Sequence, residues 1–422
     1  MDHGLNTEAL AVVSGCVIAW GLVSARFARL QITAPIAFAV MGLAVTHGPV
    51  TLIHIDLRSS TIRHLAEITL AVVLFCDASR VNVKALLADA ALPARLLGIG
   101  LPLTIGFGTA VAAALFSGSG LWVAAAVAAI LAPTDAALGA AIMQDERVPG
   151  RVRRVLNVES GLNDGIATPF VNLFLAGALA SEAIHGSGPG GAAVDLLGGA
   201  ALGAAIGAAG GALLVAAQRA GWSAAGFRQL AVLALALFAY ACALETGTNG
   251  FVAAFVAGMG FGSVIADDQL LTFAEETSVL LSLLVWFVFG ALMVVPGFQA
   301  AGWRDVVFAV LALTVVRMGP VALALTGSGL GRATVAFIGW FGPRGLASVV
   351  FGLIAYDSLA PAEAHTVIAV VTVTVALSVV AHGVTASPFA RRYGKIADGL
   401  HRVRPEHATT PALPTRTLHG NR

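Results

Sequence analysis

Residues 155–170 read VLNVESGLNDGIATPF, and they place polar side chains inside an apolar run. Glu159 and Asp164 are two carboxylates within about two helical turns, with Ser160 and Asn163 beside them. A carboxylate at the centre of a bilayer costs about 2.5–3.5 kcal/mol on insertion scales, so residues of this kind are functional candidates. The stretch therefore predicts a buried polar site on a helix that crosses a membrane.

The composition of the whole chain favours a membrane protein. Its 422 residues are 58% hydrophobic and 11% charged, whereas soluble domains carry about 25% charged residues. The net charge of +1 gives no indication of a nucleic-acid partner. The three cysteines are widely spaced in apolar segments, which is typical of buried small side chains and not of a disulfide framework or a metal motif. These features predict an all-α integral membrane protein.

Apolar runs of roughly 17–25 residues span a bilayer as helices. About thirteen such runs follow one another, centred near Val17, Phe38, Val72, Ile105, Ala128, Ala167, Gly203, Leu237, Phe255, Val285, Leu313, Ser348 and Val373. With the N-terminus outside, the outside connections hold only Arg58, Arg63 and Arg304, and the inside ones hold Arg26, Arg29, Arg80, Lys84, Arg95, Arg147, Arg151, Arg153, Arg154, Arg219, Arg228, Arg332, Arg391, Arg392 and Lys395. Positive charges collect on the cytoplasmic side. The sequence thus predicts a transmembrane domain over residues 1–393 and a short cytoplasmic tail over 394–422.

The fifth predicted span contains Pro133, followed by Thr134 and Asp135. Proline removes a backbone donor and clashes with the preceding turn, so we expect the helix to break near the middle of the membrane. Transporters use broken helices to build ion sites from freed carbonyls and helix ends. Asp135 is expected at the N-terminal end of a half-helix, where its charge offsets the helix dipole, and Thr134 offers a hydroxyl and a carbonyl. The alternative is that both residues only cap a kinked helix.

The sixth predicted span places Ser160, Asn163 and Asp164 on one helical face. A hard cation such as Na⁺ prefers oxygen ligands, which Asp164, Ser160 and the Thr134 carbonyl could supply. Burial favours the neutral carboxyl, so Asp164 is expected to hold a proton when no cation is bound. One carboxylate that binds either ion, never both, is sufficient for obligatory exchange. The alternative is a polar contact between helices without transport.

The twelfth predicted span is interrupted by Pro343, beside Arg344. A buried arginine needs a counter-charge, and Glu159 is the best-placed acid, so we predict a structural Glu159–Arg344 ion pair. Arg317 is a second buried cation, expected to meet an acid or freed carbonyls. Spans one to six and eight to thirteen make two halves of opposite orientation, each broken in its fifth span. This arrangement is the inverted-repeat signature of secondary transporters, in which broken helices cross near the midplane.

Five motifs together resemble the monovalent cation/proton antiporters, specifically the bacterial branch akin to animal Na⁺/H⁺ exchangers. They are LFCDASR at 74–80, LAPTDAALGAA at 131–141, NVESGLNDG at 157–165, NGFVAAFVAG at 249–258 and FGPRGLAS at 341–348. The specific element is the combination of Thr-Asp, Glu-Ser-x-x-Asn-Asp and Pro-Arg-Gly in this order. The similarity covers residues 8–390.

The resemblance implies a thirteen-helix fold with a core domain and a dimerisation domain, working as a homodimer by elevator-like alternating access. It implies that Asp164 is the ion- and proton-binding aspartate, with the Asn-Asp pair associated with electroneutral exchange. The residues that it assigns to the neighbourhood of Asp164 are Asn163, Ser160, Thr134 and Asp135, with Glu159 and Arg344 as the stabilising pair. Asp77 follows Cys76, whereas relatives often carry an acid directly after the phenylalanine. Asp77 is expected either to line the funnel through which the ion enters or to pair with Arg80.

We therefore expect a cell-membrane antiporter, surrounded by lipid and without a cofactor, that exchanges Na⁺, or Li⁺ or K⁺, for H⁺. The alternatives are a cation channel and a potassium-selective K⁺/H⁺ exchanger. Two broken helices that meet at a single carboxylate favour a carrier over a continuous pore. An enzyme is not expected, because no metal-ligand histidine pair or Ser/Lys dyad lies on facing spans.

Overall fold

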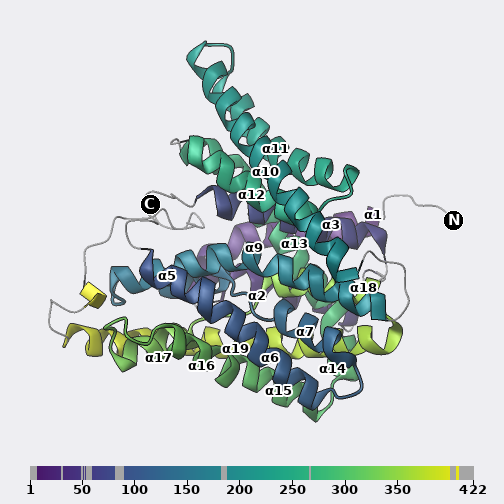
Figure 1. The fold of residues 1–422 in the computed structure, drawn as a ribbon, viewed down its shortest axis with the longest axis vertical. Coiled ribbons are helices and arrows are strands. Elements are labelled where there is room, and N and C mark those ends of the chain that lie inside the picture. Colours follow the sequence, from purple (N-terminus) through teal and green to yellow (C-terminus); the bar gives the residue numbers. More distant parts are fainter. Residues whose placement is uncertain are drawn as a thin grey trace.

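The computed structural model describes residues 7–29, 32–48, 51, 53, 59–80, 90–181, 188–265, 268–399 and 405–407, and its regular elements are all helical (Figure 1). The elements are α1 (Thr7–Arg29), α2 (Ala34–His47), α3 (Ser60–Ser79), α5 (Ala91–Arg95), η1 (Leu96–Gly100), α6 (Leu101–Leu115), α7 (Gly120–Ile130), α8 (Ala136–Met143), α9 (Gly150–Ser181), α10 (Gly188–Arg219), α11 (Ala225–Glu245), α12 (Gly250–Val264), η2 (Asp268–Leu271), α13 (Thr272–Val288), η3 (Phe289–Met293), α14 (Val294–Ala300), α15 (Trp303–Leu313), α16 (Val315–Ala324), α17 (Arg332–Trp340), α18 (Leu346–Ser358), α19 (Pro361–Asp398) and η4 (Pro405–His407). Every predicted span centre lies inside one of these helices. Within the described residues, eight helical segments are long and apolar enough to cross a membrane, so the predicted all-α multi-pass fold is confirmed.

The two predicted interruptions are present. The fifth span consists of α7 and α8, separated by residues 131–135, and the twelfth consists of α17 and α18, separated by residues 341–345. Each interruption contains its proline, Pro133 or Pro343. Both non-helical segments are buried, so their backbone groups need partners inside the protein.

Small residues set the spacing of helices at one end of the molecule. Helix α10 lies against α12 with Gly203 and Gly207 facing the carbonyls of Ala253 and Ala257, at positions where a Cβ would collide with the facing backbone. Figure 1 shows α10, α11 and α12 together at the top, with α6, α15, α16, α17 and α19 on the opposite side. The glycine-rich helix α10 therefore packs closely against α12, because small side chains let membrane helices approach closely.

Helix α9 occupies a central position and contacts α3, α7, α8, α10 and α12. Its polar residues are consequently enclosed by other helices. Glu159, Ser160, Asn163 and Asp164 are exposed by 3%, 4%, 1% and 8%. The polarity of the ESGLNDG segment is thus buried in protein.

Candidate functional site

The two interruptions cross and hydrogen-bond to each other through Asp135. Its backbone N–H donates to the Pro343 carbonyl at 2.7 Å. Its carboxylate Oδ1 accepts from the N–H groups of Ala137 and Leu138 at the start of α8, at 2.7 and 3.1 Å. The other oxygen, Oδ2, accepts from the Leu346 N–H at the start of α18, at 2.8 Å. One carboxylate therefore caps two half-helices, where its charge offsets both positive dipole ends.

Arg344 makes the reciprocal connection from the second interruption to the first. Its guanidinium Nη1 donates to the carbonyls of Ala132 and Pro133, the latter at 3.1 Å. From the first turns of α18, the Ser348 hydroxyl donates to the Ile130 carbonyl at 2.7 Å. These carbonyls lie at or beyond the end of α7, where a helix leaves its last acceptors without internal partners. The freed carbonyls that the sequence predicts are thus present, and some of them accept hydrogen bonds from Arg344 and Ser348.

Thr134 brings the first interruption into contact with α9. Its Oγ1 lies 3.1 Å from the Ser160 hydroxyl and accepts a 2.6 Å hydrogen bond from Asn163 Nδ2. This contact leaves the Asn163 Oδ1 buried and without a hydrogen-bond partner among the described residues. Asp164 follows Asn163 and lies one turn beyond Ser160 on α9. Four of the predicted site residues therefore lie close to one another, with hydroxyl, amide and carboxylate oxygens of the kind that a hard cation prefers.

The predicted Glu159–Arg344 ion pair is wrong, because the arginine that pairs with Glu159 is Arg317. Glu159 Oε1 lies 2.5 Å from Nη1 of Arg317 on α16. Arg344, which is 0% exposed, instead donates to backbone carbonyls. The physical reason is local: Arg344 sits in the interruption beside freed carbonyls, whereas Arg317 sits within a helix and needs a side-chain partner. Arg317 therefore pairs with a buried acid, which is one of the two kinds of partner that the sequence predicts for it.

Asp77 lies on α3 and is partly buried. Three residues further on, Arg80 donates Nε and Nη2 to the carboxylate of Glu275 on α13. Arg80 thus pairs with an acid on another helix, which the sequence does not predict. The role of Asp77 in an ion funnel stays a prediction.

Two buried polar residues of α19 next to the second interruption are not among the site residues that the sequence predicts. Ser378 and His382 are exposed by 0% and 4%, and both contact the interruption between α17 and α18. Their signal in the sequence is a serine and a histidine one helical turn apart inside an apolar span.

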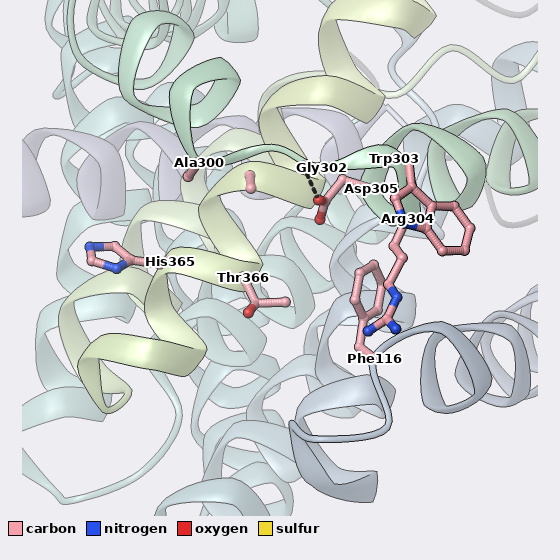
Figure 2. Close-up of a pocket in the computed structure, with 9 residues that line it drawn as sticks. Phe116, Ala300, Gly302, Trp303, Arg304, Asp305, His365 and Thr366 are labelled. Atoms are coloured by element: carbon pink, nitrogen blue, oxygen red, sulfur yellow. Dashed lines mark hydrogen bonds between the residues drawn. The ribbon is translucent and has the colours of Figure 1, made fainter.

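A surface cavity of about 330 Å³ lies elsewhere, between the start of α15, the start of α19 and Phe116. Figure 2 shows Arg304 and Phe116 on one side of it and His365 on the other, with the Gly302 N–H donating to Asp305 at 2.7 Å. Its lining residues include none of the predicted ion-site residues. The cavity is therefore separate from the polar cluster on α9.

Comparisons with known proteins agree with the fold and the motifs. A family model described as "Sodium/hydrogen exchanger, transmembrane" matches residues 13–392. A protein of Schizosaccharomyces pombe named as a probable Na⁺/H⁺ antiporter is 28% identical over 264 residues, 58% of this chain and 34% of that protein. The match thus spans about a third of this relative's length.

Two structures of the sodium proton antiporter MjNhaP1 from Methanocaldococcus jannaschii have similar folds. One, determined at pH 8, superposes with a TM-score of 0.73 at 18% identity and covers 92% of this chain and 99% of its own. The second, from an electron-microscopy map, has a TM-score of 0.72 at 18% identity and covers 94% and 100%. At this identity the likeness concerns the fold.

Proposed function

Since the chain belongs to the family of transmembrane sodium/hydrogen exchangers, a transporter family and not a class of enzymes, we propose that it exchanges Na⁺, or Li⁺ or K⁺, for H⁺ across the cell membrane. The observation that carries this proposal is the position of Asp164. Its side chain is 8% exposed on α9, next to the residue that contacts the first interrupted span. A buried carboxylate beside neutral oxygens suits an ion that competes with a proton.

In the proposed mechanism, Asp164 is the group for which cation and proton compete. The Ser160 hydroxyl and the unpartnered Asn163 Oδ1 supply neutral oxygen ligands, and Thr134 holds both side chains in place. Loss of a proton from Asp164 leaves a carboxylate that accepts one Na⁺, and arrival of a proton expels that Na⁺. Asp135 stands outside this step, because its carboxylate oxygens already accept backbone N–H groups at two helix ends.

The charge of the site supports one-for-one exchange. Asp164 with a proton and Asp164 with Na⁺ are both neutral, so either loaded form moves through the membrane without carrying net charge. The neighbouring position is the neutral Asn163, and the other buried acid, Glu159, already pairs with Arg317. We also propose that the protein works as a homodimer by alternating access, with its N-terminus outside the cell and its C-terminus in the cytoplasm.

The experiment is reconstitution of the purified protein into liposomes with an imposed pH gradient. Addition of Na⁺, Li⁺ or K⁺ should collapse the gradient for the cations that are carried, and the preferred ion is the one with the lowest KM. Collapse that is insensitive to a clamped membrane potential supports electroneutral exchange. Cation flux that leaves the pH gradient unchanged would instead identify a channel, and collapse by K⁺ alone would identify a potassium-selective exchanger.

A further inference from the structure

Helix α19 contacts both ends of the second interruption through two side chains. The Ser378 hydroxyl accepts the backbone N–H of Arg344 at 2.7 Å. His382 Nε2 lies 2.8 Å from the carbonyl oxygen of Trp340, the last residue of α17. Its Nδ1 lies 3.1 Å from the Ser378 hydroxyl and 2.8 Å from the Ser378 carbonyl. The interruption is thus held before and after its proline by neighbouring residues of one helix.

The tautomer of His382 sets the direction of donation in these contacts. The Ser378 hydroxyl accepts from Arg344, so its single proton remains available to Nδ1 of His382. With a proton on Nε2, the ring donates to the Trp340 carbonyl. The imidazole therefore ties the end of α17 to the hydroxyl that holds the start of the next half-helix. Buried hydrogen bonds of this kind restrict their members to one arrangement.

The same contacts continue toward the proposed ion site. Arg344, whose backbone is held by Ser378, donates its guanidinium to the carbonyls of Ala132 and Pro133. Pro133 immediately precedes Thr134, whose hydroxyl accepts from Asn163. A displacement of Arg344 would consequently be transmitted to the residue that orients the amide beside Asp164.

We propose that Ser378 and His382 are positioning residues for cation binding, which fix the α17–α18 interruption and, through Arg344, place Thr134 against α9. This inference rests on the proposed function. Neither residue touches the ion, so their substitution should weaken cation binding more than it slows the exchange cycle.

The chain offers a matched control between the same two helices. The Trp340 indole Nε1 donates to the Thr385 hydroxyl at 3.0 Å, which also ties α17 to α19. Among the described residues, no hydrogen bond joins Thr385 to Arg344, and the Thr385 hydroxyl donates its own proton to the Ala381 carbonyl at 2.7 Å. Thr385→Val therefore removes a link between α17 and α19 and leaves the Ser378–Arg344 contact in place.

The experiment compares Ser378→Ala, His382→Ala, His382→Gln and Thr385→Val in the liposome assay. Loss of one buried hydrogen bond should raise the KM for Na⁺ by about twofold to tenfold in both alanine variants, with a smaller change in maximal rate. His382→Gln retains a donor and an acceptor and should return the KM toward that of the parent. Thr385→Val should leave the KM near the parent value. An unchanged KM in the alanine variants, or an equal rise in Thr385→Val, would overturn the inference.

A second readout does not depend on transport. In thermal unfolding, Ser378→Ala and His382→Ala should be strongly non-additive because both interrupt one chain of contacts, whereas Ser378→Ala and Thr385→Val should add. Absence of exchange with Na⁺, Li⁺ and K⁺ in the parent would count against the proposed function alone. Additive unfolding of Ser378→Ala and His382→Ala would count against the positioning role alone.

Discussion

Glu159 on α9 and Arg317 on α16 form an ion pair whose side chains are 4% and 3% exposed, with 2.5 Å between Oε1 and Nη1. Removing one partner leaves the other charge buried and uncompensated, which costs about 3–5 kcal/mol. We therefore expect Glu159→Ala to lower the thermal unfolding temperature strongly. Thermal unfolding in detergent, followed by tryptophan fluorescence, measures the change.

An exposed pair supplies the control for this prediction. Arg63 contacts Asp357 at 2.5 Å, but these side chains are 45% and 32% exposed. Arg63→Ala should change stability by under about 1 kcal/mol. A double-mutant cycle should couple Glu159 to Arg317 more strongly than to Arg344. The opposite ranking would mean that the pairing described above is wrong.

Asp164→Asn should abolish cation-dependent collapse of the pH gradient and leave the fold intact. The amide cannot take up and release the exchanged proton, and it carries no charge to offset a cation. Liposome assays measure transport, and size-exclusion chromatography with thermal unfolding measures folding. Asp145→Asn is a matched control, because Asp145 lies in the connection between α8 and α9 and pairs locally with Arg147. Retained exchange in Asp164→Asn would remove Asp164 from the central role.

Substitutions of Asp135 separate a capping role from an ion-binding role. Asp135→Ala removes the acceptor for three backbone N–H groups. A lost cap costs about 0.5–2 kcal/mol, and a buried donor left bare costs about 1–3 kcal/mol. Asp135→Asn keeps one oxygen for the start of α8 and should lose less stability. If Asp135→Asn were as stable as the parent and yet failed to bind Na⁺, Asp135 would be a ligand.

The contact between the two interrupted spans should also be sensitive to the addition of a single methyl group. A Cβ at Gly345 would collide with the Asp135 carboxylate, which cannot move away without losing its backbone donors. Gly345→Ala should therefore destabilise the protein and reduce transport. Gly319→Ala adds the same methyl group within α16, where no described atom outside the adjoining helix backbone lies within 4 Å of the new Cβ. In that position alanine should be neutral or stabilising by up to about 1 kcal/mol, and equal losses in the two variants would contradict the steric argument.

Glu406 should stabilise the start of α17. Its side chain is 1% exposed, and Oε1 accepts from the Gly331 N–H at 2.7 Å and from the Thr334 hydroxyl at 2.9 Å. Ending the chain after residue 404 should lower the unfolding temperature, because a helix N-terminus would lose a charged acceptor worth about 1–2 kcal/mol. Ending it after residue 408 keeps Glu406 and should have little effect. Equal stability of the two truncated chains would show that the contact contributes nothing.

The hydropathy pattern predicts the helices well, but prolines alone do not predict where helices stop. Pro133 and Pro343 lie in interruptions, whereas Pro169 and Pro388 lie inside α9 and α19 without ending them. The difference lies in the partners. Around Pro133, carbonyls and N–H groups are satisfied by residues more than two hundred positions away, such as the Pro343 carbonyl. No local pattern contains that information.

The members of the polar cluster follow from the sequence more readily than their pairings. Helical spacing brings Ser160, Asn163 and Asp164 to one face, and the motif containing Thr134 supplies the fourth member. Which of two buried arginines reaches Glu159 depends instead on the free carbonyls that each one meets, and this depends on how the half-helices cross. Tertiary contacts decide such pairings.

The Glu406 contact has a consequence for the order in which the protein is completed during synthesis. Helix α17 precedes Glu406 by more than sixty residues, so α17 leaves the ribosome before the acceptor of the Gly331 N–H, directly before the helix, exists. The start of α17, the first half-helix of the twelfth span, then depends on Glu406 for its capping hydrogen bond. Until Glu406 has been synthesised, the N–H groups at the start of α17 have to bond to water or to other groups of the protein. A premature stop between the end of α19 at Asp398 and Pro405 would consequently leave every described membrane span present but would remove the acceptor at the start of α17.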